Sequence, residues 1–180
     1  EGQGRIIDPG HTMESLWFAM HAAEAFGQPA YFHRAGQVLD WVLQRAYDHE
    51  YGAFYQHVDV DGKTSGQPWR KTQYGPYEAD WDDKIWWVQA EGLYALAASA
   101  LYTENERHWQ YFLRMADYVE NALRDRDWGE WYAILARDGR VKADCKGFEL
   151  KGPYHVPRCL VNLCVLARRY LAHRLPAVSR

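Results

Sequence analysis

Two histidines with polar neighbours are the residues of this chain best suited to move protons. His155 lies between two prolines in the segment Lys151–Leu160, where Gly152-Pro153 indicates a loop. Because Pro157 suits the first turn of a helix, we predict that His155 lies on a loop just before that helix. A histidine there titrates near neutral pH and can accept or donate a proton. Taken alone, the stretch also fits an ordinary surface histidine.

The second histidine opens a pattern of three side chains on one helix surface. His11 and Glu14 are three residues apart, and Trp17 follows one turn later. In a helix capped by Asp8 or Thr12, these side chains lie on neighbouring surface of the first turns. A carboxylate beside an imidazole can orient the ring for acid–base chemistry.

A third candidate pair lies on a later helix. Trp87 and Glu91 are four residues apart and therefore share a helix face. A tryptophan one turn from a carboxylate suits the wall of a sugar-binding site. The alternative is that Glu91 is an ordinary solvated helix residue.

Composition excludes several classes of protein. The 180 residues suffice for one domain with a core, and no apolar run is long enough to span a membrane. The net charge of −3, with scattered Lys and Arg, gives no basic surface for nucleic acid. Aromatic residues make up 16% of the chain, which suits rings stacked on sugars, although the core accounts for many of them.

The cysteines bear on the compartment. Cys145, Cys159 and Cys164 are an odd number without Cys-x-x-Cys spacing, which argues against a disulfide framework and against a zinc site. We therefore expect a cytoplasmic protein. The chain begins at Glu1 rather than at a methionine, so a processed form or a fragment is expected.

Hydrophobic periodicity predicts the elements that must position these side chains. We expect an all-α protein in which short β-hairpins near residues 54–60 and 131–136 connect pairs of helices, with a loop over 64–80. The predicted helices cover residues 12–26, 30–47, 83–101, 105–123 and 157–173.

The chain also repeats itself. The run Asp48–Tyr55 recurs as Asp125–Tyr132, and Asp61-Gly62-Lys63 recurs as Asp138-Gly139-Arg140, each 77 residues later. A helix–helix–hairpin unit cannot bury its apolar face alone and must stack on its neighbours. We therefore predict a single domain over residues 1–180 that forms about half of an α/α toroid. The uncovered ends of this arc should expose an apolar edge, which a homo-oligomer or a missing segment would cover.

Four motifs together resemble one family. Asp-Pro-Gly-His-x-x-Glu-x-x-Trp-Phe (8–18), Lys-x-Trp-Trp-x-x-x-Glu (84–91), Gly-Glu-Trp-Tyr (129–132) and Tyr-His-Val-Pro-Arg-Cys-Leu (154–160) look like the N-acylglucosamine 2-epimerase family. That family includes the renin-binding protein, cellobiose 2-epimerases and aldose–ketose isomerases of mannose-type sugars. The chain resembles only the C-terminal half of its members.

The resemblance implies an (α/α)6 barrel with its active site in the central cleft. It also implies catalytic roles for His11, His155, Glu14 and Glu91, and substrate-binding roles for Trp17, Trp87 and Arg158. It implies a small sugar substrate, no cofactor and no metal, and we expect neither nucleic acid nor a membrane as a partner.

The expected chemistry is epimerisation at C2 of an aldose. A base removes the C2 proton, the enediolate is stabilised, and a proton returns on the opposite face. The resemblance suggests that His155 removes the proton and His11 returns it. Arg158 lies near His155 in the sequence and Glu14 lies near His11, which favours a neutral and a protonated imidazole respectively. Arg158 could also steady the oxyanion.

Other readings of the same residues stay open. His11, Glu14 and His155 form a two-histidine, one-carboxylate set of the kind that binds divalent metals, although no second shell is evident. Glu14 and Glu91 could be the acid and base of a glycosidase or lyase. An aldose–ketose isomerase and a non-catalytic carbohydrate-binding fragment are further alternatives.

Overall fold

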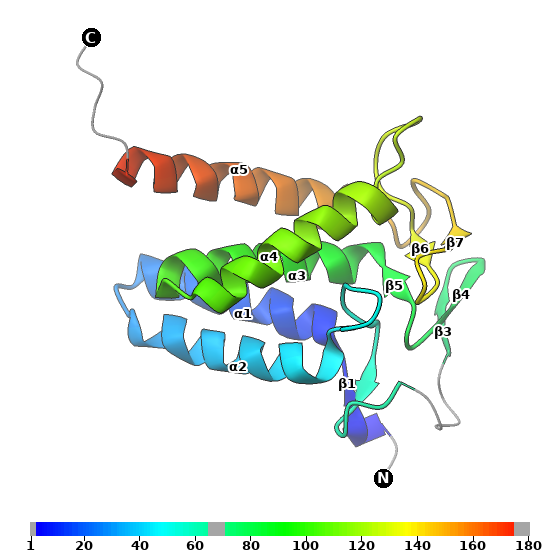
Figure 1. The fold of residues 1–180 in the computed structure, drawn as a ribbon, viewed down its shortest axis with the longest axis horizontal. Helices are drawn as coiled ribbons and strands as arrows, with labels where there is room; N and C mark the ends of the chain where they lie inside the picture. Colours follow the sequence, from blue (N-terminus) through cyan, green and yellow to red (C-terminus); the bar gives the residue numbers. More distant parts are fainter. Residues whose placement is uncertain (1–2, 65–70, 175–180) are drawn as a thin grey trace.

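The computed structural model describes residues 3–64 and 71–174 of the chain and is mainly helical (Figure 1). The α-helices are α1 (Pro9–Ala25), α2 (Ala30–Ala46), α3 (Trp86–Thr103), α4 (Glu106–Tyr118) and α5 (His155–Arg174). A 3₁₀ turn, η1 (Gln3–Arg5), precedes α1, and a π-helical turn, η2 (Val119–Leu123), extends α4. The five predicted helices are thus present, with ends shifted by a few residues.

Short antiparallel strands gather at one end of the helices. The first pair is β1 (Ile6–Ile7) with β2 (Val58–Asp59), and the second is β3 (Lys71–Tyr74) with β4 (Tyr77–Asp80). A three-stranded sheet contains β5 (Lys84–Ile85), β6 (Ile134–Leu135) and β7 (Val141–Ala143). Every strand pair in the described ranges is antiparallel.

The strand predictions were only partly right. The predicted hairpin at 131–136 corresponds to β6, whose turn partner β7 begins after Gly139. The predicted hairpin at 54–60 is wrong, because β2 pairs with β1 at the start of the chain rather than with a neighbour. The loop predicted over 64–80 is also wrong where it is described, since β3 and β4 form a hairpin there; residues 65–70 lie outside the described part.

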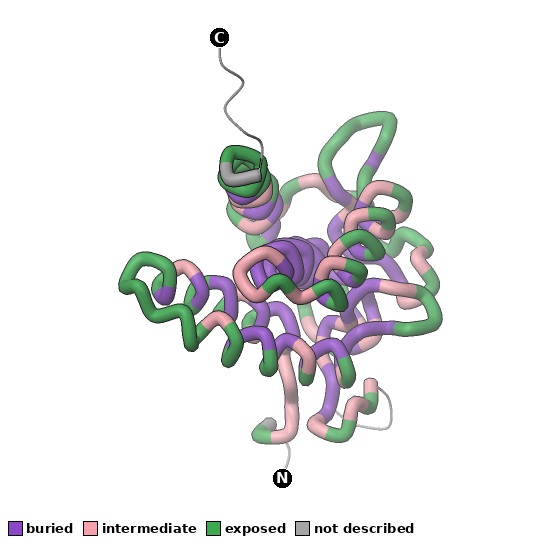
Figure 2. Tube along the Cα trace, turned by 60° about the vertical axis from the view of Figure 1, so that its left-hand side comes forward, coloured by how far each residue is buried: buried purple, intermediate pink, exposed green. Residues whose placement is uncertain are grey.

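Helix α3 is the centre of the fold. Every residue from Trp86 to Ala100 is buried, and the helix runs through the middle of Figure 2. A helix that is apolar on all sides is a core helix, and its small side chains let neighbours approach closely. At Gly92, a Cβ atom would lie 2.7 Å from the ring of Phe54. Helices α1, α4 and α5 all pack along α3, and α2 packs mainly against α1.

The 77-residue repeat is visible in the hydrogen bonds of two turns. Asp48 Oδ1 accepts hydrogen bonds from the backbone N–H groups two and three residues later, and Asp125 Oδ1 does the same. Gly52 and Gly129 hold equivalent positions with φ of 82° and 73°, where a Cβ atom would be strained. The repeat predicted from the sequence is therefore a repeat of the same aspartate-capped turn, once after α2 and once after η2.

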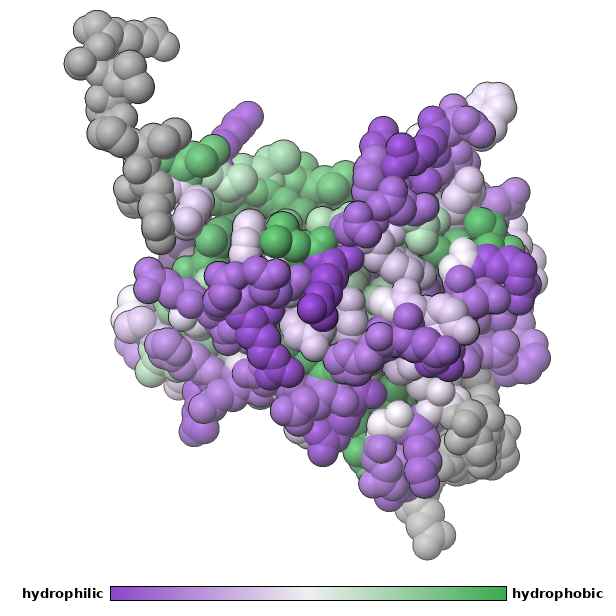
Figure 3. All heavy atoms as spheres, viewed as in Figure 1, coloured by the Kyte–Doolittle hydropathy of each residue, from purple (hydrophilic) through white to green (hydrophobic). Residues whose placement is uncertain are grey.

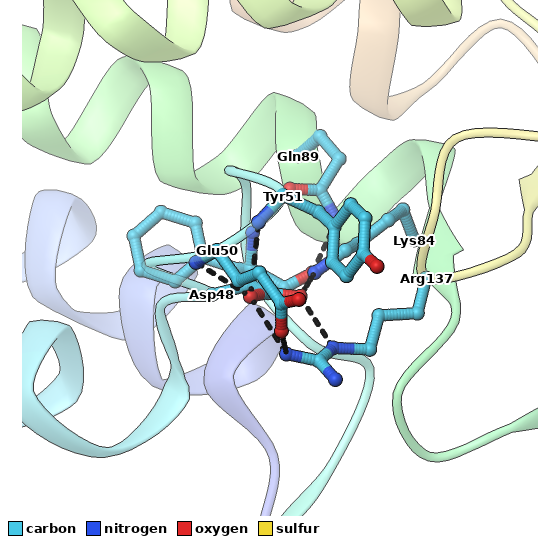
Figure 4. A network of polar contacts seen from close by, with 7 residues as sticks. Asp48, Glu50, Tyr51, Lys84, Gln89 and Arg137 are labelled. Atoms are coloured by element: carbon cyan, nitrogen blue, oxygen red, sulfur yellow. Dashed lines mark hydrogen bonds and ion pairs between the residues drawn. The ribbon is translucent and has the colours of Figure 1, made fainter.

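The first of these turns carries a buried ion cluster (Figure 4). Asp48 Oδ2 lies 3.0 Å from Lys84 Nζ and 2.8 Å from Arg137 Nε, and both Asp48 and Lys84 are fully buried. Gln89 of α3 bonds both the N–H and the C=O of Phe54 in the same turn. The cluster therefore ties the turn after α2 to β5 and to the β6–β7 connection, directly beneath the start of α3.

The cluster perturbs both ionisable partners. Burial by itself would raise the pKa of Asp48, but hydrogen bonds from Arg137 and Lys84 outweigh burial and hold that pKa well below its usual range. Burial lowers the pKa of Lys84 to about 8, against the opposing charge of Asp48. Both pKa values are thus lowered. This is consistent because Asp48 has two cationic partners, whereas Lys84 has one carboxylate partner, which it shares with Arg137.

An apolar edge is exposed along α5, as the arc-shaped architecture predicted. Leu160, Val161, Val165 and Leu171 are each more than 40% exposed. Figure 3 shows hydrophobic atoms gathered over this helix. A groove of about 540 Å³ between α3, α4 and α5 adjoins this edge and includes Trp109, Phe112 and Leu166.

Asp48→Asn tests the ion cluster. Because the folded-state pKa of Asp48 is depressed, its contribution is present above the unfolded pKa of about 3.9 and is lost as the pH falls through the folded value. We expect the substitution to lower the free energy of unfolding at pH 7 by about 3–5 kcal/mol, since Lys84 loses its buried counter-charge. The variant should also be less sensitive to acid below about pH 4, as measured by urea unfolding. Asp125→Asn in the equivalent turn is the control and should cost less; equal losses would contradict the special role of Asp48.

The exposed edge of α5 predicts self-association. We expect the molecular mass measured by light scattering to rise with protein concentration, because large exposed apolar patches favour association. Val161→Lys should shift the population toward monomer, whereas Val38→Lys, at an exposed valine of α2, should not. A monomer at every concentration would refute this expectation.

Candidate active site

The amino-terminal ends of α1, α3 and α5 meet, and both candidate histidines contact the same indole there. The ring centroid of Trp87 lies 4.7 Å from that of His11 and 5.4 Å from that of His155. Each of the three residues belongs to the first turn of its helix. The structure thus brings together two histidines that are 144 positions apart in the sequence. The side chain of His11 is 67% exposed and that of His155 is 20% exposed.

Glu91 is the buried carboxylate around which the site is assembled. Its Oε1 lies 2.6 Å from His155 Nδ1, and its Oε2 accepts a hydrogen bond of 2.7 Å from Trp17 Nε1. Arg158 Nη2 also donates to Oε1 at 2.5 Å. The side chain is only 2% exposed, so the alternative of a solvated Glu91 is wrong. These hydrogen bonds offset the desolvation cost of burying the carboxylate.

Arg158 connects the two predicted carboxylates. Its Nη2 lies 2.5 Å from Glu14 Oε1 as well as from Glu91, and its guanidinium stacks 3.9 Å from the ring centroid of Tyr154. Burial alone would lower the pKa of Arg158, but its hydrogen bonds to Glu14 and Glu91 raise it. Because Nη2 is shared by two carboxylates, this arrangement favours a role in holding Glu14 and Glu91 over the predicted contact with an oxyanion.

His11 has a different carboxylate partner from the one predicted. Its Nδ1 lies 2.6 Å from Asp8 Oδ2, whereas Glu14 binds Arg158. The reason is that α1 begins at Pro9, so Asp8 is the N-cap and His11 is the third helical residue. Side chains at these two positions reach each other. The sequence analysis considered Asp8 only as a helix cap. The three-residue spacing between Asp8 and His11 was the signal that could have identified Asp8 as the partner of His11.

The charged neighbours of the two histidines differ in part from those predicted. His155 contacts the carboxylate of Glu91, and His11 contacts that of Asp8. Both rings have an acidic partner at Nδ1, and Arg158 Nη2 also binds the Glu91 oxygen that contacts His155. His155 is also the first residue of α5 rather than a loop residue, because the helix starts two residues before Pro157.

The two tryptophans are placed differently from the expected stacking surfaces. Trp17 is only 3% exposed and donates to Glu91, so it positions that carboxylate from within the core. Trp87 is 7% exposed and lies against both imidazoles. Its Nε1 donates to Tyr74 Oη at 3.2 Å, and Gln56 Nε2 donates to the same oxygen. Tyr74 was missed because its segment was predicted to be a loop.

The candidate metal set also differs from the predicted one. Ligand atoms of Glu14, Glu91 and His155 lie within 4.8 Å of one another, whereas His11 is not a member of this group. Arg158 places a guanidinium nitrogen 2.5 Å from both carboxylates. The residues therefore hold a fixed cation of the protein between these oxygens, an arrangement that does not fit a divalent ion.

Gly10→Ala tests the packing of the site. A Cβ atom at Gly10 would lie 2.2 Å from the Trp87 ring, so the ring must move. Alanine gains about 1 kcal/mol of helix propensity over glycine, but overpacking costs about 1–3 kcal/mol, so we expect a net loss of stability. The Trp87 indole N–H resonance should also shift in the NMR spectrum. Gly4→Ala, where the added Cβ meets nothing within 4 Å, is the control; a Gly10→Ala variant as stable as the parent would contradict this packing.

The chain is similar in sequence to a known protein family and to individual proteins. Residues 2–159 match the sequence model of the N-acylglucosamine 2-epimerase (GlcNAc 2-epimerase) family. The chain is 30% identical to mouse N-acylglucosamine 2-epimerase over 98% of its own length and 41% of that protein. It is 26% identical to D-mannose isomerase of Marinomonas mediterranea over 83% of its length and 34% of the relative.

Solved structures show the same fold. A crystal structure of D-mannose isomerase superposes with a TM-score of 0.73 and 23% identity, over 88% of this chain and 37% of the other. Cellobiose 2-epimerase from Bacillus thermoamylovorans gives a TM-score of 0.71 and 22% identity, over 91% and 38%. This chain thus spans about 40% of the length of these relatives.

In the described part, no helix is long and apolar enough to cross a membrane. The sequence match over most of the chain establishes that it belongs to the N-acylglucosamine 2-epimerase family.

Proposed function

We propose that this chain carries the acid–base centre of a sugar 2-epimerase that inverts aldoses at C2. The observation that supports this most is a pair of histidines that both contact the Trp87 ring, each with Nδ1 at a carboxylate. We further propose that residues 1–180 form one domain, the C-terminal half of an (α/α)6 barrel, in which α1, α3 and α5 are inner helices. An aldose–ketose isomerase of mannose-type sugars is the second candidate, favoured by the D-mannose isomerase relative.

The reaction needs two proton carriers and a place for negative charge. One imidazole takes the C2 proton of the open-chain aldose, and the C–H electron pair moves into a C1–C2 double bond, leaving the charge on O1. The other imidazole then delivers a proton to C2 from the opposite face, and the carbonyl re-forms. We assign proton removal to His155 and proton return to His11 in the forward direction. In an isomerase C1 would instead take the proton while the hydroxyl hydrogen of O2 passes to O1, giving a ketose.

The helix ends support stabilisation of the enediolate. Because His11, Trp87 and His155 lie in the first turns of α1, α3 and α5, three positive helix ends converge on the space beside Trp87. Oriented backbone dipoles of this kind favour a developing oxyanion without reorganisation during the reaction.

The geometry gives less support to a glycosidase. Glycoside cleavage needs two carboxyl groups that flank the scissile bond. Glu14 and Glu91 both accept a hydrogen bond from the same nitrogen of Arg158, so both carboxylates are already engaged by the protein. A non-catalytic binding fragment remains the third candidate, because the chain spans only about 40% of its relatives.

Deuterium incorporation separates these functions. The chain is incubated in D₂O with N-acetylglucosamine, mannose or cellobiose, and the C2 proton is followed by NMR. We expect C2 exchange with at least one sugar. Appearance of a ketose would indicate the isomerase, release of glucose from cellobiose a hydrolase, and fluorescence quenching without chemistry a binding fragment.

The histidine roles are tested in the same assay. His11→Asn and His155→Asn should each slow epimerisation by about 10²-fold or more, because a positioned acid or base contributes on that scale. His33→Asn, at an exposed histidine of α2, is the control. If His155→Asn still exchanges the C2 proton while His11→Asn does not, the two roles are reversed. Full epimerisation by both variants would refute the two-histidine mechanism.

A further inference from the structure

We propose that Asp8 is a positioning residue for His11, which holds the imidazole with hydrogen on Nδ1 and leaves Nε2 free for the substrate. The proposal rests on the proposed function and adds a residue to it. Asp8 would serve His11 as Glu91 serves His155.

The carboxylate of Asp8 uses its two oxygens for two tasks. As the N-cap of α1, Asp8 accepts the backbone N–H of His11 at Oδ1, at 3.0 Å. Its Oδ2 lies 2.6 Å from His11 Nδ1. Since an ionised carboxylate can only accept hydrogen bonds, Nδ1 must be the donor. The neutral ring then has its lone pair on Nε2, the form that a base requires.

Neighbouring groups fix the backbone of Asp8 and the ring of His11. Thr12 Oγ1 donates to the Asp8 carbonyl oxygen at 2.7 Å, which holds the first turn of α1 in place. The His11 ring packs 4.7 Å from Trp87, a ring that Tyr74 anchors through its indole N–H. Asp8 therefore sets the rotation of a ring that is otherwise 67% exposed to solvent.

The second histidine has the same arrangement from an unrelated part of the chain. Glu91 Oε1 lies 2.6 Å from His155 Nδ1, the same distance and the same ring nitrogen as in the Asp8–His11 pair. Epimerisation is reversible, so each histidine must act as base in one direction and as acid in the other. Two imidazoles that both present Nε2 meet this requirement, and a helix cap supplies the second carboxylate.

The first experiment measures the tautomer of His11 without any substrate. Long-range ¹H–¹⁵N spectra of the labelled 180-residue chain, recorded above the pH at which its histidines titrate, distinguish hydrogen on Nδ1 from hydrogen on Nε2. We expect hydrogen on Nδ1 in the unaltered chain. In Asp8→Asn the oxygen can still cap α1, but the amide NH₂ then donates to Nδ1, so the hydrogen should move to Nε2. Asp8→Ser caps the helix without reaching the ring and should give a mixture.

A matched control is present in α4. Asn105 is its N-cap and accepts the backbone N–H of His108, also the third helical residue, but the His108 ring instead bonds Ser99 Oγ at 2.8 Å. Asn105→Ser should therefore leave the His108 tautomer and the His11 tautomer unchanged. The midpoint of thermal unfolding of Asp8→Asn should stay within about 2 °C of the parent, because asparagine and aspartate are comparable N-caps.

The second experiment measures C2 exchange on whichever sugar the parent chain turns over. We expect Asp8→Asn to lower kcat at least about tenfold with KM changed less than about twofold, because the residue acts through His11 and does not touch the sugar. An unchanged His11 tautomer in Asp8→Asn would overturn the proposal, and so would an inverted tautomer with undiminished kcat. Failure of the proposed function is recognised separately, as absence of exchange in the parent chain.

Discussion

The buried carboxylate of Glu91 is the constraint on which the rest of the site depends. A carboxylate on the most enclosed helix is costly unless donors surround it. The donors come from two helices that pack on α3, Trp17 from α1 and His155 and Arg158 from α5. Satisfying one charge therefore fixes how three helices sit relative to one another, and it orients one of the two candidate proton carriers at the same time.

The composition of α3 makes this arrangement possible. Its alanines and Gly92 allow α1 and α5 to pack closely along both sides. Three helix starts can then meet at Trp87, whose ring would collide with any side chain at Gly10. The small residues of α3 thus allow close helix packing along its length. The candidate functional side chains lie at the amino-terminal ends of the packed helices.

The two aspartate turns of the repeat hold the segments that precede α3 and α5. Asp48 caps its own turn and also neutralises Lys84, which lies two residues before α3. In the second repeat the equivalent Asp125 caps its turn and pairs with Lys146, while the buried Lys151 contacts Glu130 shortly before α5. In both repeats, a lysine shortly before a helix, α3 or α5, binds a carboxylate of the preceding turn. This anchors the start of α3 and of α5, where the candidate catalytic groups lie.

The sequence by itself determined the helices, the 77-residue repeat and most of the residues that meet at the candidate site. These features are local or periodic, since helical spacing, capping residues and a repeated Asp-x-x-x-Gly turn can be recognised without knowledge of distant contacts. The tertiary structure alone decided the partners: that Glu91 and not a nearer acid binds His155, that Trp17 is buried, and that β2 pairs with β1. The hydrogen-bond partners of a buried charge or of an edge strand are the groups that packing places beside it. Those groups come from segments far apart in the chain, so the sequence pattern does not identify them. The Asp8–His11 contact lies between these cases, because it spans only three residues but depends on the helix beginning at Pro9.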